Sequence, residues 1–175
     1  IDPMPNTYFT RDPFAIVGKG VNLNRMFSVT RNRETLFGKY IFRDHPDYND
    51  APLWYRRDAA YHTEGGDVLN LNAHTVAIGI SQRTQASAID CLAQHMFWDK
   101  SDECEIDTIY AFNIPVSRAF MHLDTVFTQI DVDKFTIHPG ILGTLQVFKL
   151  TAGSVPGEVK IEEMNDTLEH ILSKA

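Results

Sequence analysis

Apolar and polar positions in the middle of the chain predict a strand, a second strand, a helix and a third strand. Residues 67–71 alternate as in a half-buried strand, and residues 75–80 form an apolar run typical of a buried strand. A helical period follows, with Thr84 as the expected N-cap. Residues 105–112 complete the unit as a third strand. The apolar face of the expected helix consists of Ile89, Leu92, Ala93, Met96 and Phe97.

The same order of elements is predicted upstream. Residues 14–17 and 21–23 are strand-like and flank a Gly-Lys-Gly turn. Residues 31–42 have a helical period, and residues 53–55 form the closing strand. The apolar residues of this helix are Leu36, Phe37, Tyr40 and Ile41.

The last part of the chain is less regular. Strands are expected at 126–130 and 134–137, separated by Asp131-Val132-Asp133, and again at 145–150 and 159–162. A short helix is expected at 167–174. The pattern shows no clear helix around 139–143, where a third unit would need one.

A polar cluster precedes the first strand of each unit. The clusters are Asn6 to Asp12, Glu64 to Asp67, and His122 with Asp124. They recur at intervals of roughly 50 to 60 residues, a spacing compatible with a propeller-like array of repeated units. The sequence therefore predicts an α/β fold built of strand-strand-helix-strand modules. Their approximate bounds are 1–60, 61–118 and 119–175, and one site is assembled from all three.

His122 and Asp124 form the most specific of these clusters. In a strand, residues two apart point to the same side of the backbone. A histidine is a general acid or base near neutral pH, and a nearby carboxylate keeps it poised and offers an anchor for a cation. The alternative is an ordinary histidine in a loop. That reading fits His122 poorly and applies well to His62, His74, His95 and His170.

For the other polar residues, an ordinary structural role is an alternative to a functional one. Arg11 and Asp12 form what is ordinarily a solvated pair or a turn, and Glu64-Gly65-Gly66-Asp67 could be an acidic turn in which glycines supply positive φ. In the functional reading, the glycines let the backbone pass close to a ligand that Glu64 faces. Arg31 and Arg83 are either solvent-facing or hold a substrate carboxylate through a bidentate contact.

Composition narrows the class of protein. A chain of 175 residues with 43% hydrophobic content suffices for one domain with a real core, and no apolar run is long enough to span a bilayer. The net charge of −7, without a Lys/Arg run, argues against nucleic acid or an anionic membrane as main partner. Cys91 and Cys104 match no metal-ligand spacing, and we expect two reduced thiols in a cytoplasmic protein. No phosphate loop and no metal-ligand set is present, so no cofactor is expected.

Taken together, three acids, one histidine and two arginines suit a zwitterionic guanidino acid such as arginine, because acids pair with its cation and arginines with its anion. The motifs resemble the arginine deiminase family. They are Met4-Pro5-Asn6-x-x-Phe9-Thr10-Arg11-Asp12, Arg31-Asn32-Arg33-Glu34-Thr35, Glu64-Gly65-Gly66-Asp67, Ile78-Gly79-Ile80-Ser81-Gln82-Arg83-Thr84 and Met121-His122-Leu123-Asp124-Thr125-Val126-Phe127. The resemblance covers essentially the whole chain. Individually the motifs also admit amidinotransferases and dimethylarginine hydrolases.

The resemblance implies a five-unit α/β propeller, or pentein, that hydrolyses L-arginine to L-citrulline and ammonia. It implies that Asp12 and Asp124 grip the substrate guanidinium and that Glu64 and His122 transfer protons. We expect these four side chains to line one concave pocket at the hub, with an arginine at the opposite end. The residues implied at the α-amino-acid end are Asn6, Arg31 and Arg83, and Phe9 is implied to pack on the substrate.

The family's nucleophile is a cysteine in a Gly-rich Cys-Met segment near its C-terminus, and it attacks the guanidinium carbon to give a covalent amidino intermediate. Neither Cys91 nor Cys104 follows that pattern. The chain, which opens on Ile1-Asp2-Pro3, is therefore expected to be a central fragment that is catalytically incomplete and needs the remaining segments of its parent. A homo-oligomer is left open. The rival hypothesis is a non-catalytic module that binds arginine.

Overall fold

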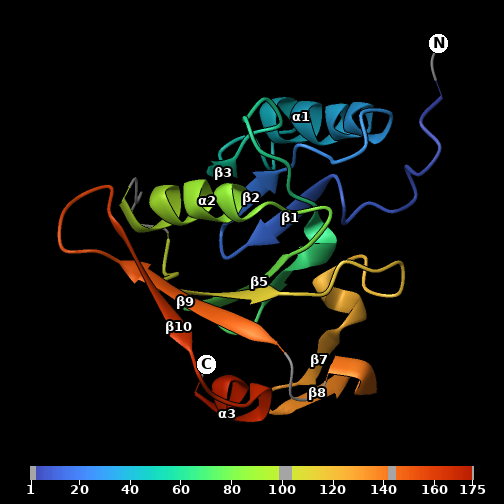
Figure 1. Cartoon of the computed structure of the whole chain (residues 1–175). Helices are drawn as coiled ribbons and strands as arrows, with labels where there is room; N and C mark the ends of the chain where they lie inside the picture. Colours follow the sequence, from blue (N-terminus) through green and yellow to red (C-terminus); the bar gives the residue numbers. More distant parts are fainter. Residues whose placement is uncertain (1–2, 99–103, 142–144, 175) are drawn as a thin grey trace.

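The computed structural model describes residues 3–98, 104–141 and 145–174. In this part of the chain the strands form a three-stranded, a five-stranded and a two-stranded sheet. Figure 1 shows helix α2 (Ala86–Trp98) between the three-stranded sheet and the five-stranded sheet. No helix within the described ranges is long and apolar enough to cross a membrane.

The first predicted unit is confirmed in its order of elements. Strand β1 pairs with β2 antiparallel, and β2 pairs with β3 in parallel. The turn between β1 and β2 uses Gly18 at φ 55°, a conformation that glycine adopts without the steric cost of a side chain. The elements are β1 (Phe14–Val17), β2 (Gly20–Leu23), the 3-10 turn η1 (Arg31–Arg33), α1 (Thr35–Asp44) and β3 (Leu53–Tyr55).

The second unit repeats that topology. Strand β4 pairs with β5 antiparallel, and β5 pairs with β6 in parallel. All five apolar residues predicted to line one face of α2 are buried. The elements are the 3-10 turn η2 (Gly65–Asp67), β4 (Val68–Asn70), β5 (Thr75–Ile80), α2 and β6 (Thr108–Asn113).

The third part of the chain departs from the pattern. Strands β7 (Phe127–Asp131) and β8 (Lys134–Ile137) form a separate antiparallel pair. Strands β9 (Gln146–Ala152) and β10 (Val159–Met164) instead extend the sheet of the second unit, in the order β10-β9-β6-β5-β4. Between β8 and β9 the described residues form only a 3-10 turn, η4 (Pro139–Ile141); residues 142 and 143 of the stretch without a clear predicted helix lie outside the described ranges. The chain closes with the expected short helix, α3 (Leu168–Ser173).

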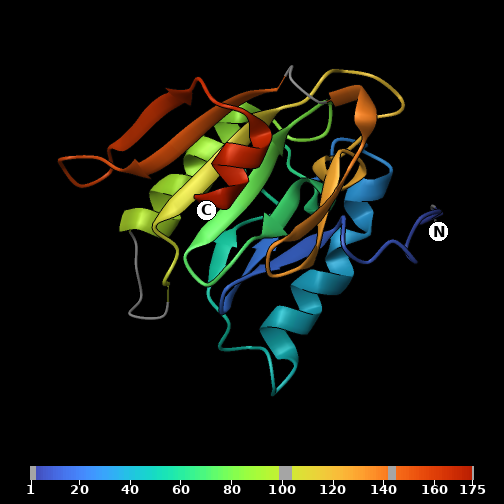
Figure 2. The ribbon, with the colours of Figure 1, turned by 90° about the horizontal axis from the view of Figure 1, so that it is seen from below.

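The five-stranded sheet is buried on both faces at β5, where successive side chains point to opposite sides. Val76 and Ile78 pack in one core cluster with α2, whereas Ala77 packs in another cluster with β7 and Ile171 of α3. Figure 2 shows α2 and α3 on opposite faces of this sheet. The first cluster also contains Trp54 of β3, so α2 joins the two larger sheets into one body.

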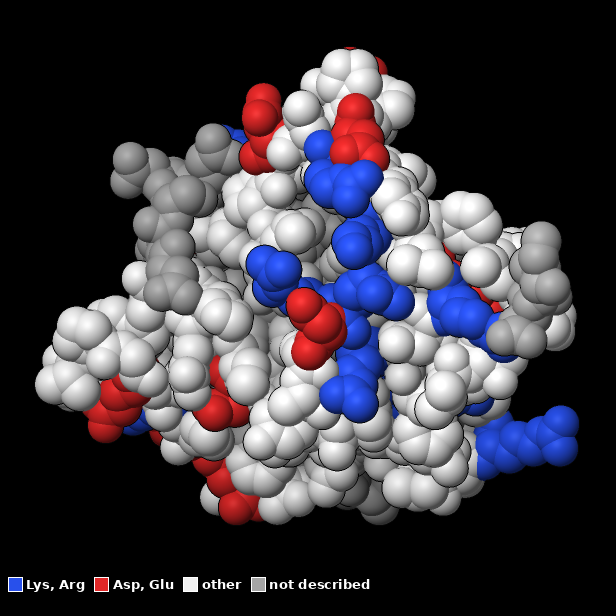
Figure 3. All heavy atoms as spheres, turned by 90° about the horizontal axis from the view of Figure 1, so that it is seen from above, with Lys and Arg blue, Asp and Glu red and all other residues white. Residues whose placement is uncertain are grey.

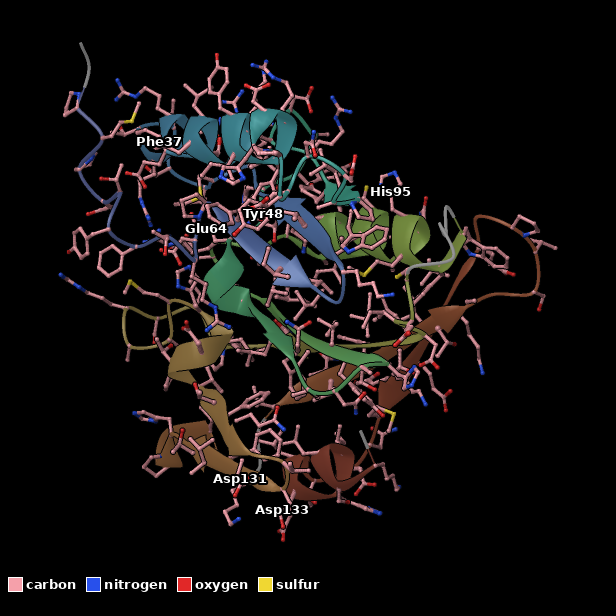
Figure 4. All side chains as sticks on the ribbon, turned by 180° about the vertical axis from the view of Figure 1, so that it is seen from behind. Phe37, Tyr48, Glu64, His95, Asp131 and Asp133 are labelled. Atoms are coloured by element: carbon pink, nitrogen blue, oxygen red, sulfur yellow. The ribbon has the colours of Figure 1, made fainter. Side chains whose placement is uncertain are left out.

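Two local features differ from what the sequence pattern alone indicates. Three of the four apolar residues in the first predicted helix are largely exposed on α1, where Phe37 is the most exposed at 55% (Figure 4). The helix packs through Gly38 instead, because a Cβ there would lie 2.8 Å from Leu23 Cδ1 and 3.0 Å from Phe14 Cδ1. Thr84 does not cap α2, which begins at Ala86, because its hydroxyl is bonded to Asp67.

Candidate active site

The two predicted proton-transfer residues occupy equivalent local positions. Glu64 and His122 each have extended backbone and stand immediately before a 3-10 turn, η2 for Glu64 and η3 (Leu123–Thr125) for His122. Each turn leads into the first strand of its unit. The expectation that His122 and Asp124 share one side of a strand is wrong, because Asp124 lies in η3 and strand β7 begins only at Phe127.

Glu64 and His122 form a buried pair. His122 Nε2 lies 2.9 Å from Glu64 Oε2, and the two residues are 9% and 0% exposed, respectively. Figure 4 labels Glu64 where the first sheet meets the start of β4. Gly66 makes room for the ring, since a Cβ at that position would lie 2.6 Å from His122 Nδ1.

Electrostatics favour the protonated form of His122. Burial alone lowers the pKa of the imidazole, but the hydrogen bond to Glu64 and the charges of Asp67, Asp12 and Glu64 outweigh it and raise the pKa above the usual value. An imidazolium at near-neutral pH can donate a proton and take it back. The pair therefore has the properties of a general acid–base group.

The two predicted guanidinium-binding carboxylates lie beside this pair. Asp12 Oδ2 accepts a hydrogen bond of 2.9 Å from Arg31 Nη1, and Asp124 Oδ2 lies 4.0 Å from Arg11 Nη1. Burial raises the pKa of Asp124, as does the charge of Asp12, while His122 and Arg11 act against that rise. The hydrogen bond of 3.1 Å from Gly65 N–H to Asp12 O and the contact between η2 and η3 place Asp12, Asp124 and His122 in one region.

The two predicted arginines lie on the carboxylates, not at the opposite end of a pocket. Arg31 bonds to Glu34 Oε2 at 3.0 Å as well as to Asp12, and Arg83 Nη1 lies 3.3 Å from Glu64 Oε2. Glu34 and Glu64 are almost fully buried, and a buried carboxylate without a cationic partner is costly. Arg31 therefore neutralises Asp12 and Glu34, and Arg83 neutralises Glu64.

The N-terminal residues of the predicted site surround Arg31. The backbone N–H of Asn6 donates to Glu34 Oε1 at 3.1 Å, next to the Arg31–Glu34 pair. The ring of Phe9 has its centroid 5.9 Å from Arg31 Cζ, and 47% of Phe9 is exposed. Both residues thus lie at the outer side of the cluster.

Asp67 is a functional candidate that sequence reasoning missed. Its Oδ1 accepts from the Leu123 N–H at 2.9 Å, and its Oδ2 accepts from the hydroxyls of Ser81 and Thr84, both at 2.7 Å. Burial raises its pKa to about 6, although these hydrogen bonds and His122 oppose the rise. One carboxylate thereby joins the turns that carry Glu64, Arg83 and His122. The only sequence signal was its place at the end of the Gly-Gly cluster.

Neither cysteine belongs to this cluster. Cys91 and Cys104 pack in and against the core around α2 and Trp54, and burial raises the pKa of the Cys91 thiol. A cavity of about 600 Å³ opens beside Arg11, but residues 69–72, 128, 129, 131 and 132 line the rest of it. The expected shared pocket stays a prediction: Glu64 and His122 do not line this cavity, and in the described part of the chain they pack directly against each other. Within the described ranges no group of three His, Cys, Asp or Glu is placed to hold a metal ion.

Comparison with known sequences agrees with the motifs. A sequence model described as arginine deiminase matches residues 1–175. An arginine deiminase of Treponema denticola is 56% identical over 175 residues, covering 99% of this chain and 42% of that protein. One of Clostridium perfringens is 52% identical over 177 residues, again with 99% and 42% coverage. The chain thus spans less than half the length of these relatives.

Comparison with solved structures concerns the fold alone, because the identities are low. Unliganded AgrE has a TM-score of 0.61 and 21% identity, covering 78% of this chain and 18% of that chain. A variant of DDAH from Pseudomonas aeruginosa complexed with citrulline has a TM-score of 0.55 and 19% identity, covering 77% and 47%. The chain shares its α/β fold with such proteins.

Proposed function

Because this chain belongs to the arginine deiminase family, we propose that it carries the acid–base and guanidinium-binding part of a site that hydrolyses L-arginine to L-citrulline and ammonia. The observation that carries the proposal is the buried Glu64–His122 pair, with the carboxylates of Asp12 and Asp124 beside it. In this proposal the three predicted modules are units of a five-unit propeller, and the remaining units belong to the parent protein.

The cluster is chemically matched to a guanidinium group. The chain's own guanidinium groups already lie against its carboxylates, Arg31 on Asp12 and Arg83 on Glu64. A substrate guanidinium would take the place between Asp12 and Asp124, where planar bidentate pairing is available to it. Arg31 and Arg83 would then turn to the substrate α-carboxylate, with Asn6 and Phe9 closing that end.

His122 and Glu64 would carry the protons. A cysteine thiolate of the parent protein adds to the guanidinium carbon, and the His122 imidazolium protonates the departing nitrogen as the C–N bond breaks and ammonia leaves. Water then adds to the amidino thioether while His122 takes up its proton. The C–S bond then breaks while Glu64 takes the remaining hydroxyl proton, which releases citrulline and restores the thiolate. Glu64 also holds the ring of His122 and stabilises it whenever it is charged.

Citrulline formation tests the proposal. We expect the full-length protein to convert arginine, and His122→Gln and Glu64→Gln to reduce its kcat by several orders of magnitude. The matched control is Lys134→Ala on the exposed β8, which should leave turnover unchanged. This chain alone should be inactive, and turnover by it that is lost on Cys91→Ser or Cys104→Ser would overturn our placement of the nucleophile. Arginine binding by the full-length protein without turnover would favour the binding module.

A further inference from the structure

A second charged feature lies beside α1. A cavity of about 320 Å³ opens between α1, the end of β2 and the segment after β3. Figure 3 shows a band of Lys and Arg side chains on the face that carries α1. The charged residues that line the cavity are Lys39, Arg43, Arg56, Arg57 and Asp58. Four cations against one acid are concentrated here, although the whole chain carries a net charge of −7.

One of these cations, Arg57, is held in place by the protein, and another, Arg43, lies over an aromatic ring. Arg57 donates from Nε to Thr35 Oγ1 at 2.8 Å and from Nη2 to Asn32 O at 3.4 Å. Arg43 lies with its Cζ 4.7 Å from the centre of the Tyr40 ring. A guanidinium fixed in this way loses little freedom when it binds an anion.

Lys39 differs from the others because, in the described part of the chain, it has no hydrogen bond or ion pair. Arg43 and Arg56 are paired with Asp44 and Asp58, but all four of these side chains are more than half exposed. Such exposed pairs are weak and exchange partners at little cost. The cavity therefore offers cations that an incoming anion can recruit.

The rest of the lining is apolar or neutral and comes from Leu23, Phe42, Leu53 and Asn49. The volume is at the lower end of the range found for small-molecule sites. We propose that this cavity binds the phosphate group of a small phosphate monoester, with its organic part against the apolar lining. None of the lining residues belongs to the acid–base cluster, so this proposal does not depend on the proposed reaction.

Calorimetric titration of the full-length protein with phenyl phosphate, inorganic phosphate and phenol tests the assignment. We expect phenyl phosphate to bind more tightly than inorganic phosphate, and phenol not to bind. Lys39→Glu should weaken phenyl phosphate binding tenfold or more, which corresponds to the loss of roughly one charge-assisted hydrogen bond. Arg56→Ala, another exposed position, serves as a second test, and Lys134→Ala on β8 is the control that should bind normally.

An NMR titration with the same ligands locates the binding site through the chemical shifts of the α1 amides. Changes at residues 39 to 43 that disappear in Lys39→Glu support the cavity. The proposal is overturned if neither phosphate binds, if Lys39→Glu and Arg56→Ala bind as tightly as the control, or if the shifts lie elsewhere. Equal affinity for phenyl phosphate and inorganic phosphate would overturn the role of the apolar lining and with it the monoester.

Discussion

Replacing Asp67 by asparagine should separate two effects of this buried charge: its cost in the free energy of unfolding and its role in positioning His122. The side chain is fully buried, and its two oxygens accept three hydrogen bonds from two separate turns. Asparagine keeps the shape and one acceptor oxygen but replaces the other oxygen with a donor. We expect the remaining amide oxygen of the asparagine to face the hydroxyls of Ser81 and Thr84. Both hydroxyl oxygens already accept hydrogen bonds from backbone N–H groups, so each hydroxyl must donate to residue 67. The bond to Leu123 N–H is then lost.

The effect on stability follows from the pKa of Asp67, which burial raises from 3.8 to about 6. A carboxylate with a raised folded pKa binds its proton more tightly in the native state, so the free energy of unfolding falls as pH rises between these values. The shift corresponds to a penalty of about 3 kcal/mol on the charged form above pH 6. Asparagine avoids it. We therefore expect equal stabilities near pH 4 and a variant that is up to about 3 kcal/mol more stable near pH 7.

Urea unfolding of both proteins near pH 4 and near pH 7 measures this difference. Asp133→Asn, at an exposed position, removes a charge without such burial and should leave the pH dependence unchanged (Figure 4). Despite its stability, Asp67→Asn should lose the position of His122, seen as faster hydrogen exchange at Leu123 N–H and a lower pKa of His122. Parallel stability curves for the variant and the native protein would refute the reasoning.

Three further outcomes are expected. Gly66→Ala forces a methyl group against the ring of His122 and should reduce kcat of the full-length protein by about 10²-fold, whereas Gly140→Ala, with its nearest contact at 3.2 Å, should not. Glu64→Gln should lower the pKa of His122 in an NMR titration. The stability due to the charged ring is present below pH ~6.5 and is lost as pH rises through the raised folded pKa, so this loss should be smaller and complete at a lower pH in the variant. Ile78→Ala, at a site 1% exposed, should cost about 2–5 kcal/mol in unfolding free energy, and a loss below 1 kcal/mol would contradict the core assignment.

Local pattern was sufficient for the first two units and insufficient for the third. Alternation and helical period are properties of neighbouring residues, and they located β4, β5 and α2 closely. The pairing of β9 with β6 is a contact between distant segments, which no local period encodes. The packed face of α1 could not be predicted from the hydrophobic pattern, because it packs through Gly38, and a glycine contributes no hydrophobic signal.

The candidate site divides in the same way. Residue types and order were enough to select Asp12, Glu64, His122 and Asp124, which the structure brings together. The bonds among them were not predictable, because they depend on how three turns meet. Asp67 was passed over since its partners are a backbone N–H and two hydroxyls from other segments, and these have no distinctive spacing.

The long sequence separations within the cluster have a consequence for folding. The contact of His122 with Glu64 spans 58 residues, and that of Leu123 with Asp67 spans 56. Closing such loops is entropically costly, so contacts that reward it only weakly form late. Changes in the cluster should then accelerate unfolding and leave the folding rate unchanged. During refolding, the fluorescence of the buried Trp54 should recover before the ring resonances of His122 do, so that a chain with a finished core still lacks its acid–base pair.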